Sequence, residues 1–130
     1  MVCSACGGAV VDFSIPEGAR EYAPGDGEAA SICTTCLTVD SSEHPDDDPD
    51  FSRVSDAFPA TPAAAVPLAL ALGRCDSLVT NRAALETLLE RVERAGTDPL
   101  LLIDRLVADP SLEPAVDLER RRHQLEDLFY

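Results

Sequence analysis

The chain has 130 residues and a hydrophobic content of 45%, which is enough for a globular core and excludes wholesale disorder. Its 24 acidic residues face only 10 basic ones, and the net charge of -14 argues against a general nucleic-acid binder, because it repels phosphate. The N-terminus lacks the pattern of a secretory signal, and no apolar run reaches the ~20 residues of a membrane helix, so we expect a cytoplasmic protein without a membrane anchor.

The first part of the chain, residues 1–40, carries short β-patterns. Residues 9–15 predict a strand that Pro16 ends, because apolar and polar side chains alternate over residues 11–15 with the period of a half-buried strand. Residues 30–32 and 37–39 predict two further short strands. We therefore expect a small antiparallel sheet in this part of the chain.

Two Cys-x-x-Cys pairs frame the same region and predict a metal site. Cys3 and Cys6 form the first pair, and Cys33 and Cys36 form the second. A tight turn at each pair aims both sulfurs at one point, and two such turns place four thiolates ~2.3 Å from one Zn²⁺ ion. In a reducing compartment cysteines hold metal more often than they form disulfides, so the sequence predicts one zinc per chain.

Other uses of these cysteines stay open. A rubredoxin-like iron site has similar pairs, and unmetallated thiols are a further alternative. A redox dithiol is less favoured, because neither pair has the βαβ context of a thioredoxin-like motif. The fifth cysteine, Cys75, has no nucleophile signature around it and is predicted to be an inert core residue.

Residues 41–60 form an acidic, proline-rich stretch with the composition of a solvated linker. Phe51, Val54 and Phe58 recur within it at helical spacing. Aromatic side chains are costly to leave in water, so we expect a short turn here that docks on the helical part of the chain.

Residues 61–130 show helical periodicity and predict about four helices. The first helix either begins at Pro62 and kinks at Pro67, or begins near Val66, and is expected to run to Val79. The second begins after Asn81 as N-cap and ends before Gly96, with its leucines in one apolar stripe.

The third and fourth helices have weaker boundaries. Asp98 and Pro99 predict the start of the third, and a fourth is expected from around Pro114. The chain is therefore predicted to be an α+β protein. It has a zinc ribbon of short antiparallel strands at residues 1–40, a linker at 41–60 and a helical domain at 61–130.

The chain ends on an apolar and partly aromatic segment. Leu128, Phe129 and Tyr130 follow one another in a sequence that has few aromatic residues. If these side chains are exposed together, they form a small apolar patch suited to a partner protein, and we interpret them as a candidate partner-binding site.

Residues 1–40, with their two cysteine pairs, resemble a zinc ribbon. The whole chain also resembles a family of small uncharacterised haloarchaeal proteins with an N-terminal zinc ribbon and a helical C-terminal part. Besides the four cysteines, this resemblance is carried by Asp48-Pro49-Asp50-Phe51 and by Asn81-Arg82-Ala83-Ala84. It implies a fold and a zinc site, but no activity.

The composition agrees with a halophilic origin, because lysine is absent and aspartate is abundant. In molar salt the Debye length falls to ~3 Å, which screens the self-repulsion of the chain. We interpret the protein as a non-enzymatic zinc-ribbon module of a halophilic archaeon, an adaptor whose partner is a protein. A nucleic-acid-associated transcription or translation factor is the alternative, and an enzyme of unknown type is a third possibility. An acidic surface made for a basic partner is the rival explanation of the charge.

Overall fold

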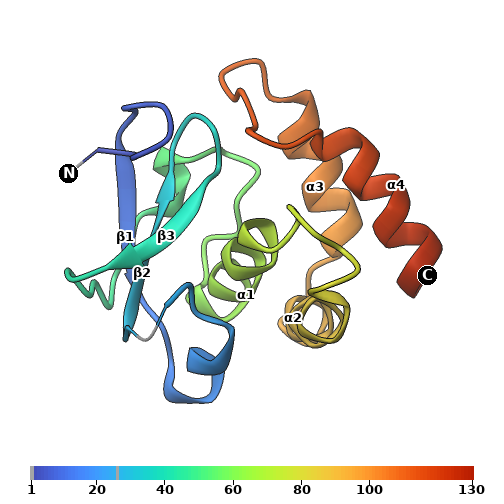
Figure 1. The fold of residues 1–130 in the computed structure, drawn as a ribbon, viewed down its shortest axis with the longest axis horizontal. Helices are drawn as coiled ribbons and strands as arrows, with labels where there is room; N and C mark the ends of the chain where they lie inside the picture. Colours follow the sequence, from blue (N-terminus) through green and yellow to red (C-terminus); the bar gives the residue numbers. More distant parts are fainter. Residues whose placement is uncertain (1, 26) are drawn as a thin grey trace.

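The structure is a computed structural model that describes residues 2–25 and 27–130. It has a three-stranded antiparallel sheet followed by four α-helices, as Figure 1 shows, which confirms the predicted α+β fold class. The strands are β1 (Val10–Ser14), β2 (Ala29–Cys33) and β3 (Val39–Ser42), in the spatial order β1-β2-β3. A short 3₁₀ helix, η1 (Glu17–Tyr22), lies between the first two strands.

The sheet has one face in the core, as the alternation in β1 predicted. Val11, Phe13 and Ile15 are buried, and the polar residues between them are not. The central strand, β2, is buried along its whole length because it has a neighbour on each side. The third strand begins at Val39 and not at residue 37, because Leu37 adopts a left-handed conformation with φ of 63° that turns the chain before the strand starts.

The first α-helix, α1 (Pro62–Gly73), begins at the earlier of the two expected positions and keeps Pro67 inside it. Its residues 64–72 are all buried, because the helix lies between the sheet and the other helices (Figure 1) and contacts both β3 and α2 (Arg82–Arg94). A helix that is apolar on every side is typical of such a central position. The expected extension to Val79 is wrong, because the chain leaves the helix after Gly73.

The remaining helices are α3 (Pro99–Ala108) and α4 (Leu118–Phe129). The Asp98 carboxylate accepts hydrogen bonds from the backbone N–H groups at the start of α3, as its place in the sequence predicted. Asn81 precedes α2 as expected, but its side chain bonds to Arg74 and does not cap the helix. The fourth helix starts at Leu118, later than the expected Pro114.

The hydrophobic core is continuous from the sheet to the helices. A short 3₁₀ turn, η2 (Phe51–Arg53), places Phe51 against Phe13 of β1, with ring centroids 5.4 Å apart, and Phe58 stacks on Phe51 at 5.2 Å. Val54 is buried in the same cluster, so this turn packs in the core and reaches the sheet through Phe51, whereas the sequence suggested docking on the helical part of the chain. The division into a ribbon, a linker and a helical domain stays a prediction.

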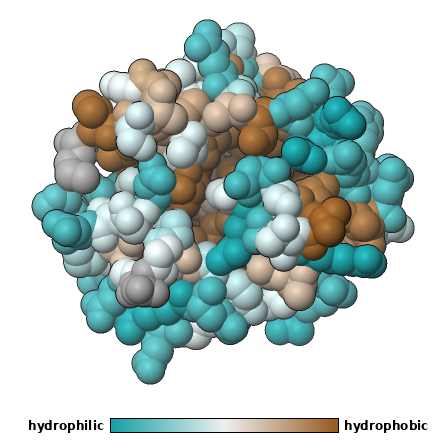
Figure 2. All heavy atoms as spheres, in the orientation of Figure 1, coloured by the Kyte–Doolittle hydropathy of each residue, from teal (hydrophilic) through white to brown (hydrophobic). Residues whose placement is uncertain are grey.

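Hydrophilic residues cover much of the face seen in Figure 2, and apolar residues gather in a hollow near its centre. Within the part of the chain that the structure describes, no helix is both long and apolar enough to cross a bilayer.

Candidate metal centre

The two cysteine pairs meet at one end of the sheet. Cys3 and Cys6 precede β1, in a turn closed by the β-bridge between Val2 and Ala9. Cys33 is the last residue of β2, and Cys36 lies in the turn that follows it. Because β1 and β2 are antiparallel, the first residue of β1 pairs with the last residue of β2, and the register places Val10 opposite Cys33. The pairing of these strands therefore brings the two turns together.

The two turns share two equivalent hydrogen bonds. The Cys3 N–H donates to Gly8 O at 2.7 Å, and the Cys33 N–H donates to Thr38 O, at the equivalent spacing, at 2.9 Å. In each turn the Sγ of the first cysteine accepts a bond from the N–H two residues later, at 3.4 Å in both cases. We call these turns the first knuckle (residues 3–8) and the second knuckle (residues 33–38).

A left-handed residue follows the second cysteine of each knuckle. In the first knuckle it is Gly7, with φ of 76°, and in the second it is Leu37, with φ of 63°. Glycine adopts this conformation without steric cost, but a leucine pays roughly 1–2 kcal/mol for it. The Leu37 side chain is buried in the core, and this packing offsets the cost of its backbone.

The four sulfur atoms lie as close together as ligands of one ion. Cys3 Sγ is 3.7 Å from Cys36 Sγ, Cys6 Sγ is 3.4 Å from Cys33 Sγ, and all four lie within 4.8 Å of one another. Ligands ~2.3 Å from a tetrahedral metal are about 3.8 Å apart, whereas the sulfurs of a disulfide are about 2.05 Å apart. The spacing thus fits a four-coordinate metal site, and the cluster could hold a metal ion.

Gly8 leaves room for the sulfurs. A Cβ atom added there would lie 3.3 Å from both Cys33 Sγ and Cys6 Sγ, and 3.1 Å from the Thr35 hydroxyl. Such contacts are tighter than ordinary van der Waals packing. The first knuckle therefore needs a residue without a side chain at the point where its backbone passes the second.

The sulfur cluster favours a cation electrostatically. A backbone hydrogen bond from Gly8 lowers the pKa of Cys6, but the neighbouring Cys33 and Cys36 side chains and burial outweigh it and raise that pKa to about 12. The Cys6 thiol therefore resists ionisation, because its thiol neighbours and burial favour the neutral form. A divalent cation among them would reverse this effect and hold the sulfurs as thiolates.

The second knuckle also binds the C-terminal half of the chain, a contact that no pattern in the sequence indicates. The N–H of Glu113 donates to Thr35 O at 2.8 Å, and the N–H of Ala115 donates to Cys36 O at 3.0 Å. The segment before α4 is thereby tied to the knuckle, and the helix begins at Leu118 after Asp117, whose carboxylate caps it by accepting a hydrogen bond from the Arg120 N–H. No local motif near residue 114 signals this pairing, because both acceptors are backbone carbonyls distant in the sequence.

The other residues singled out in the sequence lie away from this cluster. Cys75 is buried in the hydrophobic core, where burial raises the pKa of its thiol to about 12 and its Sγ donates to Ala71 O. At the C-terminus, Leu128 and Tyr130 are exposed, whereas Phe129 packs partly against the core. The three residues therefore do not form one exposed surface, and their role in binding a partner stays a prediction.

The comparisons with known proteins bear on the family alone. No curated protein and no solved structure matches the chain. A family model described as "Family of unknown function (DUF6276)" matches residues 2–129, which is nearly the whole chain. The match covers the four cysteines, both knuckles and all four α-helices. The protein is therefore a member of the DUF6276 family.

Proposed function

We propose that this protein is a non-enzymatic zinc-ribbon module that holds one Zn²⁺ ion through Cys3, Cys6, Cys33 and Cys36 and binds another protein. The observation that carries the proposal is the cluster of four sulfur atoms within 4.8 Å of one another, built from two knuckles that share two equivalent hydrogen bonds. Four cysteine sulfurs are a common ligand set of structural zinc sites.

The four sulfurs support a structural role over a catalytic one. They fill a tetrahedral coordination shell, whereas a catalytic zinc keeps one position open for water or substrate. Three of the four cysteines are also buried, which limits access to the ion. The ion would supply binding energy that holds the two knuckles together, worth roughly 10–16 kcal/mol in small zinc peptides.

A protein is the favoured partner class. The net charge of -14 opposes binding to nucleic acid. The run of three arginines on α4 does not supply a free basic patch either, because Arg122 donates hydrogen bonds to Glu126 at 2.8 Å and to Asp104 at 3.2 Å. We further propose that the protein works in the salt-rich cytoplasm of a halophilic archaeon, which the lack of lysine and the acidic surface support.

Metal analysis tests the first part of the proposal. The protein is produced in medium that contains both zinc and iron, and its metal content is measured by mass spectrometry. We expect close to one zinc per chain, a large loss of zinc in Cys33→Ser, and no change in Cys75→Ala, which alters a cysteine outside the cluster. A protein that carries iron, or one that loses its zinc in Cys75→Ala, would contradict the assignment.

A further inference from the structure

The outer edge of β3 has backbone groups without a partner strand. In an antiparallel ladder, residues alternate between pairs that exchange hydrogen bonds and pairs that do not. The Cys33 N–H donates to Thr38 O, so the next pair, Ile32 with Val39, belongs to the second kind. The N–H and C=O of Val39 therefore point away from β2, towards the edge that no described strand covers.

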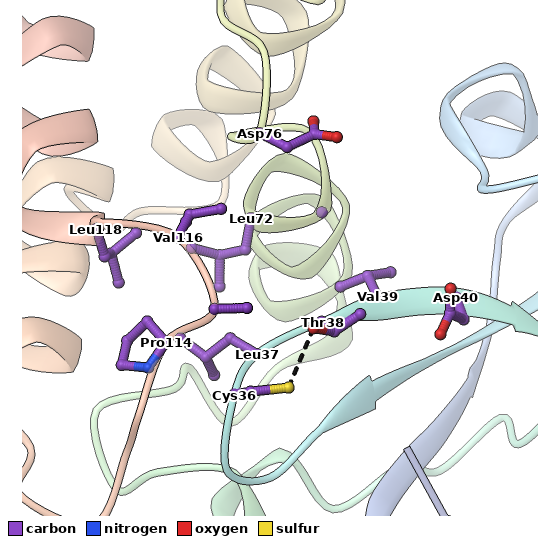
Figure 3. Close-up of a pocket in the computed structure, with 12 residues that line it drawn as sticks. Cys36, Leu37, Thr38, Val39, Asp40, Leu72, Asp76, Pro114, Val116 and Leu118 are labelled. Carbon is purple, nitrogen blue, oxygen red and sulfur yellow. Dashed lines mark hydrogen bonds between the residues drawn. The ribbon is translucent and has the colours of Figure 1, made fainter. Parts of the chain in front are cut away.

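A hollow of about 320 Å³ lies beside this edge. Figure 3 shows it between β3, the end of α1 and the segment that leads into α4. Three successive residues, Thr38, Val39 and Asp40, line it. Successive side chains of a strand point to opposite faces, so a hollow lined by all three lies along the edge of the sheet and not over one face. Its remaining wall is mainly apolar and includes Leu72, Val116 and Leu118.

A second hollow, of about 310 Å³, lies on the other side of Val39, next to Tyr22 and Leu70. Val39 separates the two hollows where it packs closely over Gly73. Alternate side chains of an extended strand lie roughly 7 Å apart on the same face. Two hollows on either side of one edge residue are therefore suited to two alternate side chains of an added strand.

The charges around the first hollow select the kind of strand. Its charged lining residues are Asp40 and Asp76, both exposed, and no arginine lines it. The Asp40 carboxylate is held in place by a hydrogen bond from the Ser4 hydroxyl at 3.0 Å. The one arginine of the second hollow, Arg74, is occupied by Tyr22 O and the Asn81 side chain. A partner with basic residues would complement this rim.

We propose that the edge of β3 is a docking site for an extended segment of a partner protein, in which apolar side chains alternate with basic ones. The segment adds a fourth strand to the sheet through the backbone of Val39 and places two apolar side chains in the two hollows. Its basic side chains point to the opposite face of the sheet, where Asp40 lies. This inference rests on the proposed interaction role, because it identifies the partner surface.

The probe is the peptide Ac-Lys-Leu-Lys-Leu-Lys-NH₂, added to the ¹⁵N-labelled, zinc-loaded full chain and followed by NMR. We expect the largest amide shift at Val39. Two further peptides carry N-methyl groups, one on the leucine backbone nitrogens and the other on the lysine backbone nitrogens. Each modification removes the N–H donors of one of the two possible strand registers, so at least one of these peptides should lose binding. Asp40→Asn should weaken binding about threefold. The matched control Asp127→Asn, which lines neither hollow, should leave it unchanged.

Several results would overturn the docking site. One is that the analogue with glutamate in place of lysine binds as tightly as the original peptide, and another is that both N-methylated peptides bind unchanged. A third is that the free protein is a dimer in which the Val39 amide is already protected from hydrogen exchange. Absence of peptide binding overturns it as well. Zinc content is measured on the same sample, so that a zinc-loaded protein that ignores the peptide contradicts only the docking site and not the zinc ribbon.

Discussion

Replacing Gly73 with alanine tests the contact between the sheet and the central helix. A Cβ atom at position 73 would lie 2.8 Å from Val39 Cβ and 3.3 Å from both of its methyl carbons. The nearest of these atoms is attached directly to the β3 backbone, so a change of side-chain rotamer cannot relieve the contact. Either β3 or the end of α1 has to move.

Two opposing effects set the size of the change. Alanine in a helix is more stable than glycine by up to about 1 kcal/mol, whereas overpacking a core costs about 1–3 kcal/mol. We therefore expect Gly73→Ala to lower the free energy of unfolding by about 1 kcal/mol, and the melting temperature by about 4 °C for a chain of this length. Val39→Ala removes the two methyl carbons at 3.3 Å but keeps the Cβ atom at 2.8 Å, so it relieves only part of the contact. It should be less costly in the Gly73→Ala protein than in the parent, by about 0.5 kcal/mol.

Urea denaturation of the four proteins of this double-mutant cycle measures both quantities. The control is Gly18→Ala, because a Cβ atom at that position meets nothing within 4 Å and no such loss is expected. The close approach of β3 and α1 would be refuted if the Gly73→Ala protein were as stable as the parent and if Val39→Ala cost the same free energy of unfolding in both proteins.

Three further predictions concern salt, acid and the C-terminus. Melting temperature should rise as potassium chloride is raised from ~0.1 M to molar concentration, where the Debye length falls from ~10 Å to ~3 Å; indifference to salt would favour an acidic surface made for a basic partner. Hydrogen bonds from Ser111 and Ser55 lower the pKa of Asp109, so the carboxylate stabilises the fold above pH ~4 and this stabilisation is lost in stronger acid. The difference in free energy of unfolding between the parent and Asp109→Asn should therefore shrink as the pH falls below ~4. A difference that stays constant with pH would contradict the role of this carboxylate. Deleting residues 126–130 removes the last turn of α4 together with Phe129, which packs partly against the core, so we expect a lower melting temperature. A truncated protein that keeps its full stability but no longer binds its partner would instead assign the C-terminal residues to partner recognition.

Local chemistry explains which features the sequence could predict. The knuckles were predictable because both cysteines of each pair belong to one turn, and the start of α3 was predictable because Asp98 caps it through its own side chain. The alternation in β1 identified the buried Val11 and Phe13. In each case the residues that determine the structure are neighbours in the sequence.

Long-range contacts explain what the sequence left open. The path of residues 113–115 depends on bonds from Glu113 and Ala115 to two carbonyls of the second knuckle, and no residue near Pro114 indicates them. The expected role of Asn81 as a side-chain cap is wrong because Arg74, at the end of α1, binds its amide instead. The central position of α1 was available in principle, since a helix that is apolar all round indicates burial on all sides.

The bonds between the second knuckle and residues 113–115 have a consequence for the order of folding. More than half of the chain separates the donors from their acceptors, so the knuckle leaves the ribosome long before the segment that covers it. Until then Thr35 O and Cys36 O are hydrated. A metal ion that binds the nascent knuckles would thus meet them with one side open to water, and the C-terminal segment would enclose that side later.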